Sequence, residues 1–131
     1  MKRTMYILAF LMLAVFSSCT KETTYTFTDN ADYSVISEHL LGRTVYLKEY
    51  NNDGNYITEN TIESPNTGQS YTFIADERTE KIKVNYTIIV QAGSSTIEWN
   101  RWVNTVYYIE KGKDISIELN DHTIVGPDEP Q

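Results

Sequence analysis

The chain has 131 residues, a formal net charge of −7 and a single cysteine, Cys19. This length suits one domain with one hydrophobic core, and a lone cysteine excludes a disulfide within the chain. Binding to nucleic acid depends on Lys and Arg side chains that neutralise phosphates. Because acidic residues outnumber basic ones here, we expect no nucleic-acid partner.

Residues 1–18 have the composition of an export signal. Two basic residues precede the apolar stretch Met5–Phe16, which is shorter than the roughly 20 residues that a transmembrane helix needs. Small residues ending at Ser18 directly precede Cys19. This junction resembles the lipobox of bacterial lipoproteins, in particular those of the Bacteroides group. The resemblance implies that the signal is removed and that Cys19 is acylated, for example with palmitate.

The same resemblance implies a place in the cell. The acylated Cys19 would anchor the chain to a membrane of the cell envelope, and Thr20 is not the aspartate that retains some lipoproteins at the inner membrane. We therefore expect the outer membrane, on its periplasmic face or at the cell surface. The expected divisions are a signal peptide at 1–18, the acylated Cys and a linker at 19–22, a β-domain at 23–125 and a flexible tail at 126–131.

Alternation of apolar and polar residues dominates the chain after Cys19 and predicts β-strands. In Lys81–Val90, every second residue from Ile82 is apolar and most residues between are polar, so this segment is the candidate for a central strand. The predicted strands are Thr24–Thr28, Arg43–Tyr50, Gln69–Ala75, Lys81–Val90, Thr96–Val103, Val106–Glu110 and Asp114–Asn120, with a short edge strand at His122–Val125.

Two segments between the strands carry local signals. Asn52–Asn55 contains Asp-Gly and other residues that tolerate positive φ, which predicts a hairpin turn. Asp32–Leu41 is ambiguous. Apolar residues from Val35 to Leu40 fall at helical spacing, whereas Tyr33–Ser37 alternates like a short strand. Helix and strand both remain open for this segment.

Seven or eight short strands with near-regular spacing predict an all-β fold, a single antiparallel β-sandwich, with a small β-barrel as the alternative. The order of Thr44–Leu47, Asp53-Gly54, Thr67-Gly68 and Tyr71–Phe73 resembles small Ig-like or transthyretin-like domains of envelope proteins. One such domain, of unknown function, precedes thioredoxin-like domains in some lipoproteins. This chain contains no Cys-x-x-Cys, so the resemblance implies architecture and no redox role.

The residues give no pattern for catalysis or a cofactor. His39 and His122 are the only histidines, and neither stands in a nucleophile-elbow or zinc-type spacing. Acidic residues such as Glu98 could pair for glycoside hydrolysis, but a small sandwich rarely provides the necessary cleft. Asn51–Asn55 is rich in oxygen ligands yet lacks the closing bidentate Glu of an EF-hand. We therefore predict no catalytic residue, no metal site, no cofactor and no enzyme.

The aromatic residues near the C-terminal third are the candidates for contact with a ligand or partner. Trp99 and Trp102 are three residues apart and cannot share a face of a strand, so we expect one in the core and one exposed. Tyr107 and Tyr108 follow closely and would add an outward ring. The sequence predicts a non-enzymatic interaction or accessory module that meets an envelope protein. The alternative is a small-ligand or glycan binder that uses these rings.

Overall fold

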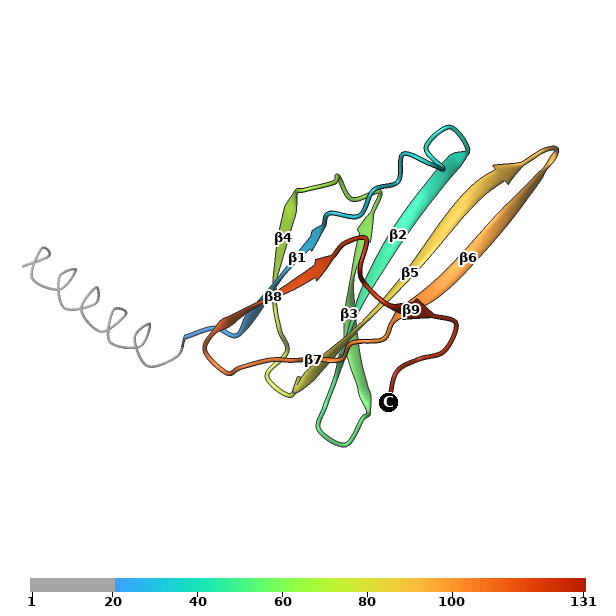
Figure 1. Ribbon diagram of the computed structural model, residues 1–131. Helices are drawn as coiled ribbons and strands as arrows, with labels where there is room; N and C mark the ends of the chain where they lie inside the picture. Colours follow the sequence, from blue (N-terminus) through green and yellow to red (C-terminus); the bar gives the residue numbers. More distant parts are fainter. Residues whose placement is uncertain (1–20) are drawn as a thin grey trace, which may run out of the picture.

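The computed structural model describes residues 21–131, which form nine β-strands and no helix (Figure 1). Residues 1–20, with the expected signal peptide and Cys19, lie outside the described residues. In chain order the strands are β1 (Thr24–Asp29), β2 (Leu40–Tyr50), β3 (Tyr56–Glu63), β4 (Ser70–Ile74), β5 (Lys81–Ala92), β6 (Ser95–Val103), β7 (Tyr107–Tyr108), β8 (Asp114–Leu119) and β9 (Val125–Gly126).

The strands form two sheets, which confirms the predicted β-sandwich rather than its alternative, a closed barrel. The smaller sheet has three strands in the order β4-β1-β8. The larger has six strands, in which β3-β2-β5-β6-β9 are successive neighbours and β7 pairs with β5. All pairs are antiparallel except β1 and β8, which are parallel.

The hydrophobic core lies between the sheets and follows the predicted alternation. Each deeply buried apolar side chain hides surface worth roughly 1.5–3 kcal/mol of stability. Among the described residues, eight of them are exposed by 1% or less: Tyr25, Phe27, Val45, Leu47, Ile82, Val84, Val103 and Ile117.

The predicted central strand and hairpin are both confirmed. β5 has β2 along one edge and β6 and β7 along the other. In the turn between β2 and β3, Gly54 has a φ of +84°, a conformation that glycine adopts without steric cost. Asn51 Oδ1 accepts hydrogen bonds from the backbone N–H groups of Asp53 (3.0 Å) and Asn55 (2.9 Å).

The ambiguous segment Asp32–Leu41 is neither a helix nor, before Leu40, a strand. Two successive turns replace both expectations, because the N–H of Ile36 donates to Tyr33 O and the N–H of His39 donates to Ile36 O. Each turn is closed by a single backbone hydrogen bond, and the chain then enters β2.

Two predicted strands are shorter than expected. The predicted strand Val106–Glu110 is reduced to β7. β6 pairs with β5 from Asn85 onward, so only the first residues of β5 are free on that edge, and β7 pairs with two of them, Lys81 and Ile82. The edge strand predicted at His122–Val125 begins later, as β9, because a turn closed by the N–H of Thr123 and Asn120 O precedes it.

Candidate functional site

The outer face of the larger sheet, which points away from the smaller sheet, carries polar and aromatic side chains. They alternate along each strand with the core residues. On β2, for example, Tyr46 lies between the buried Val45 and Leu47, and Lys48 follows Leu47. The outer face includes Glu59 from β3, which pairs with Lys48. It also includes Tyr46, Lys48 and Tyr50 from β2, Lys83, Asn85 and Thr87 from β5, and Asn100 and Trp102 from β6.

Strand register brings three of these residues into one row. Tyr46 pairs with Asn85, and Asn85 pairs with Trp102. Neighbouring strands are about 4.8 Å apart, so the two aromatic residues stand roughly 10 Å apart across the sheet. Asn85 lies between them and is only 4% exposed. Lys48 Nζ lies 5.9 Å from the centre of the Tyr46 ring and 5.3 Å from that of Trp102, within cation–π range.

The side-chain amide of Asn85, in this row, and that of Asn100, next to it, hold each other in a fixed orientation. Asn85 Nδ2 donates to Asn100 Oδ1 (2.9 Å), and Asn100 Nδ2 donates in return to Asn85 Oδ1 (3.0 Å). Asn100 Nδ2 also donates to Thr87 Oγ1 (3.0 Å). Because Asn100 is exposed, its ordered amide is presented to solvent next to the Trp102 ring. We call Tyr46, Lys48, Asn85, Asn100 and Trp102 the aromatic–amide patch.

The chain's own C-terminal segment occupies the other end of the outer face. The Tyr50 hydroxyl donates to Glu129 Oε1 (2.6 Å), and burial, together with this carboxylate, raises the pKa of Tyr50. Lys83 Nζ lies 3.9 Å from Glu129 Oε1 and 4.5 Å from the centre of the Tyr50 ring. Within the aromatic–amide patch, Asn100 is exposed and Tyr46, Lys48 and Trp102 are half-buried.

The structure does not bring the four predicted aromatic residues together. Trp102 lies in the aromatic–amide patch, whereas Trp99 pairs with Ile88 and points to the opposite side of the sheet. The expectation that one tryptophan is in the core is wrong, because Trp99 is 39% exposed and Trp102 is half-buried. Tyr107 packs against the core. Tyr108 is 66% exposed and pairs with Lys81, at the far end of β5.

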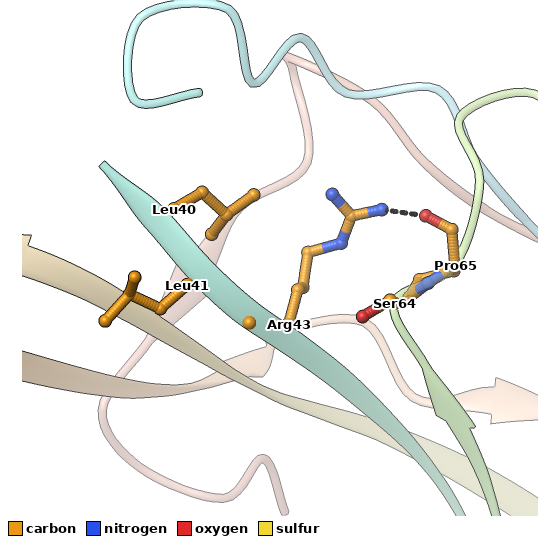
Figure 2. Close-up of a pocket in the computed structure, with 6 residues that line it drawn as sticks. Leu40, Leu41, Arg43, Ser64 and Pro65 are labelled. Carbon is orange, nitrogen blue, oxygen red and sulfur yellow. Dashed lines mark hydrogen bonds between the residues drawn. The ribbon is translucent and has the colours of Figure 1, made fainter. Parts of the chain in front are cut away.

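A cavity of about 220 Å³ lies beside Arg43 (Figure 2). Arg43 Nη2 donates to Pro65 O (2.5 Å) and lies 3.5 Å from the fully buried Asp29 Oδ2, and the Tyr33 ring stacks 4.0 Å from the guanidinium carbon. Arg43 Nε is buried without a hydrogen-bond partner. Since Asp29 balances the charge and Nε has no accessible surface, this cavity presents no free charge to a ligand.

A second buried acid, Glu49, lies in the core at 1% exposure. Its Oε1 accepts hydrogen bonds from Thr79 Oγ1 (2.6 Å) and the N–H of Asp76 (2.8 Å), and its Oε2 accepts from the Tyr25 hydroxyl (2.8 Å). Burial raises the pKa of Tyr25. With its oxygens occupied and shielded from solvent, Glu49 serves the fold rather than acid–base chemistry.

The described residues offer little for metals or membranes. Within residues 21–131, no group of three His, Cys, Asp or Glu side chains lies close enough to hold a metal ion. In the asparagine-rich hairpin, Asn51 Oδ1 is already used by the turn. Over the same range, the structure contains no helix of the length and hydropathy needed to cross a membrane.

Sequence reasoning missed most of the aromatic–amide patch. Alternation placed Tyr46 and Lys48 on a polar face, and Asn85 opposite the apolar residues of its strand. It could not reveal that Tyr46, Asn85 and Trp102 share a row, because register depends on which strands pair. The buried acids did leave a signal, since Asp29 and Glu49 fall in phase with the core residues of their strands.

Comparison with known proteins adds no relative. Neither protein-family models nor curated proteins nor solved structures gave a match to this chain.

Proposed function

We propose that this protein is a non-enzymatic, lipid-anchored module of the bacterial cell envelope that binds a glycan on the outer face of its larger sheet. The anchor is assigned to Cys19 on the basis of the lipobox-type junction after Ser18. The β-sandwich then carries the binding surface, and its ligand contacts are Trp102 and its neighbours in the aromatic–amide patch.

The observation that carries the glycan assignment is the row Tyr46–Asn85–Trp102. Aromatic rings offer flat apolar faces to the C–H groups of sugar rings, and ordered amides form hydrogen bonds with sugar hydroxyls. Two rings roughly 10 Å apart on one flat face suit an extended chain of sugar units rather than a single enclosed one. The amide of Asn100 needs no reorientation on binding, which lowers the entropic cost of association.

The charge of the protein narrows the class of glycan. The chain as a whole carries −7, which repels an anionic polymer. Lys48, the basic residue in the patch, lies 3.7 Å from Glu59 Oε1 and is therefore balanced locally. We propose a neutral polysaccharide or oligosaccharide as the ligand.

Isothermal calorimetry with the full chain tests this proposal. The chain is kept in a polyoxyethylene detergent, which has no sugar headgroup, and titrated with hexasaccharides of β-1,4-glucan, β-1,4-mannan, β-1,4-xylan and α-1,4-glucan. We expect one of them to bind, with at least tenfold weaker affinity in Trp102→Ala. Trp99→Ala, which removes the tryptophan on the opposite face, is the matched control and should bind as the wild type does.

Failure takes two forms. If no neutral oligosaccharide binds, the glycan assignment is wrong, and the remaining function is contact with an envelope protein, to be sought by crosslinking in cells. If Trp99→Ala weakens binding as much as Trp102→Ala, the site is not on the outer face.

The lipid anchor has a separate test in the producing cell. Cys19→Ser should abolish incorporation of a labelled fatty acid and leave an unprocessed precursor. Normal processing of this variant would refute the lipobox assignment and leave the glycan proposal untouched.

A further inference from the structure

A cavity lies at the end of the sandwich where β1 begins. Its volume is about 420 Å³, and its lining includes Lys21, Glu22, Ile74, Glu77 and Lys111. These residues come from three segments: the chain before β1, the end of β4 with the loop that follows it, and the turn before β8. Figure 1 shows the start of β1 beside the turn before β8, at the end of the molecule opposite the β1–β2 turn.

Hydrogen bonds hold the three segments together. Thr23 O accepts a hydrogen bond from the N–H of Ala75 (2.9 Å), and Thr23 Oγ1 accepts one from the N–H of Gly112 (2.9 Å). The N–H of Thr24 donates to Lys113 O (3.0 Å). The backbone around the cavity is therefore fixed by the fold from Thr23 onward.

The cavity lies close in sequence to the proposed lipid anchor. Only Thr20 separates Cys19 from Lys21, so the Cα atoms of Cys19 and Lys21 are at most about 7 Å apart in any conformation. The headgroup region on each side of a bilayer is about 5–7 Å deep. When the hydrocarbon chains on Cys19 enter the bilayer, Lys21 is therefore held at or next to the lipid headgroups.

The charged side chains at the cavity match a zwitterionic lipid surface. Among the described residues that line it are two lysines and two glutamates, so their formal charges cancel: Lys21, Lys111, Glu22 and Glu77. Lys111 Nζ donates to Glu77 O (2.7 Å) and Thr79 O (3.0 Å), which orders the ammonium group without neutralising its charge. A zwitterionic headgroup offers a phosphate to the lysines and a cationic amine to the glutamates.

An exposed apolar side chain lies at the same end. Ile74 is 61% exposed and pairs in register with Thr24, the first residue of β1. The preceding Phe73 packs against the core, so Ile74 points away from it. Transfer of this side chain from water to the boundary between headgroups and acyl chains is favourable.

We propose that this end of the sandwich docks on the membrane, with Ile74 inserted among zwitterionic phospholipids and their headgroups in the cavity. The inference rests on the proposed lipid anchor and does not depend on the proposed glycan. Because the anchor already holds the chain at the bilayer, docking is an intramolecular step, and a small contact suffices. The five steps of β1, about 3.3 Å each, lead away from the membrane toward the β1–β2 turn.

Fluorescence quenching in vesicles tests the docking. The proposed lipid modification occupies the thiol of Cys19, so Ile74→Cys and its control Val35→Cys, in the β1–β2 turn, each provide one exposed site for a bimane label. The processed lipoprotein is reconstituted into phosphatidylcholine vesicles in which a tenth of the headgroups carry a nitroxide. We expect at least threefold more quenching at position 74 than at position 35. Equal quenching, or more at position 35, overturns the proposal.

Flotation of the same vesicles in a density gradient separates this inference from the anchor on which it rests. A chain that does not float with the vesicles refutes the lipid anchor, and the docking falls with it. A chain that floats while its label at position 74 is not quenched refutes the docking alone.

Lipid composition tests the assignment of the headgroup. Half of the phosphatidylcholine is replaced by anionic phosphatidylglycerol at low salt, with the nitroxide fraction unchanged. Quenching at position 74 should fall at least twofold, because the cavity has no net positive charge to offset the repulsion of a chain of −7. Quenching that stays the same or rises overturns the assignment to zwitterionic lipid.

Discussion

The two faces of the larger sheet are built from alternate residues of the same strands, yet they differ in what covers them. On β2, Leu47 points into the core and is fully buried, while the neighbouring Lys48 lies beside the rings of Tyr46 and Trp102 on the outer face. The inner face is covered by the smaller sheet, whereas on the outer face the C-terminal segment contacts Tyr50 and Lys83 through Glu129. Substitutions on the inner face should therefore cost stability, and those on the outer face should cost binding.

The largest expected loss of stability is at Glu49, the acid on the inner face. Glu49→Ala leaves the Tyr25 hydroxyl, Thr79 Oγ1 and the Asp76 N–H without their acceptor. Because each buried donor without a partner costs about 1–3 kcal/mol, we expect the free energy of unfolding to fall by about 4 kcal/mol. Urea denaturation followed by circular dichroism measures it.

The matched acid on the outer face is Glu59, whose Oε1 lies 3.7 Å from Lys48 Nζ. Ion pairs with this much solvent contact contribute about 0.2–1 kcal/mol, so Glu59→Ala should lose no more than this. Equal losses in Glu49→Ala and Glu59→Ala would contradict the division between the two faces.

The next effect comes from Leu47, which should lose about 3 kcal/mol on substitution by alanine, within the range for buried leucines. Its neighbour Lys48 provides the contrast on the same strand. Lys48→Ala removes methylene packing and a cation–π contact worth about 0.5–1 kcal/mol. A thermal melt of both variants distinguishes them, and a larger loss in Lys48→Ala would mean that the outer face contributes to folding.

The contrast between Leu47 and Lys48 also explains how far sequence reasoning reaches. Period-two alternation fixes which residues of β2 and β5 share a face, and the turn at Gly54 fixes where β2 reverses. These are local signals, and they suffice for the β-sandwich and for its central strand.

Pairing between distant strands is not a local signal. Nothing in β1 indicates that it lies parallel to β8, and nothing in β6 indicates that β9 covers only its last two residues. For this reason the sequence identified Trp102 but not Tyr46 or Asn85, which reach the same row through the register of β2, β5 and β6. It also missed that Trp99 is exposed although Ile88, its partner on β5, is buried.

A smaller effect on stability is expected at Trp102. Trp102→Ala should reduce the free energy of unfolding by roughly 1 kcal/mol, because the ring is half-buried on the open face and its contact with Lys48 is of cation–π type. Urea denaturation measures this loss. A loss as large as that of Leu47→Ala would show that Trp102 is a folding residue, and the weaker glycan binding of this variant would then need another explanation.

The smallest effect lies outside both faces, in the loop between β4 and β5. Arg78 holds the pKa of Asp76 at about 2, below its ordinary value of 3.8, because Arg78 Nε donates to Asp76 Oδ1 (3.0 Å) and the backbone N–H of Arg78 donates to the same oxygen (2.9 Å). A carboxyl whose pKa is lowered by folding adds stability above its unfolded pKa, so this contribution is complete above pH 3.8 and is lost as the pH falls toward 2.

Titration of the Asp76 carboxyl by NMR separates the two sources of this shift. Arg78→Ala removes the guanidinium but keeps the backbone N–H, so the pKa of Asp76 should rise and still remain below 3.8. Asp32 is the internal control, because the N–H of Ser34, 2.9 Å from its Oδ1, lowers its pKa without any contribution from Arg78. A wild-type Asp76 that titrates near 3.8 would mean that this ion pair does not persist in solution, as exposed pairs often do not.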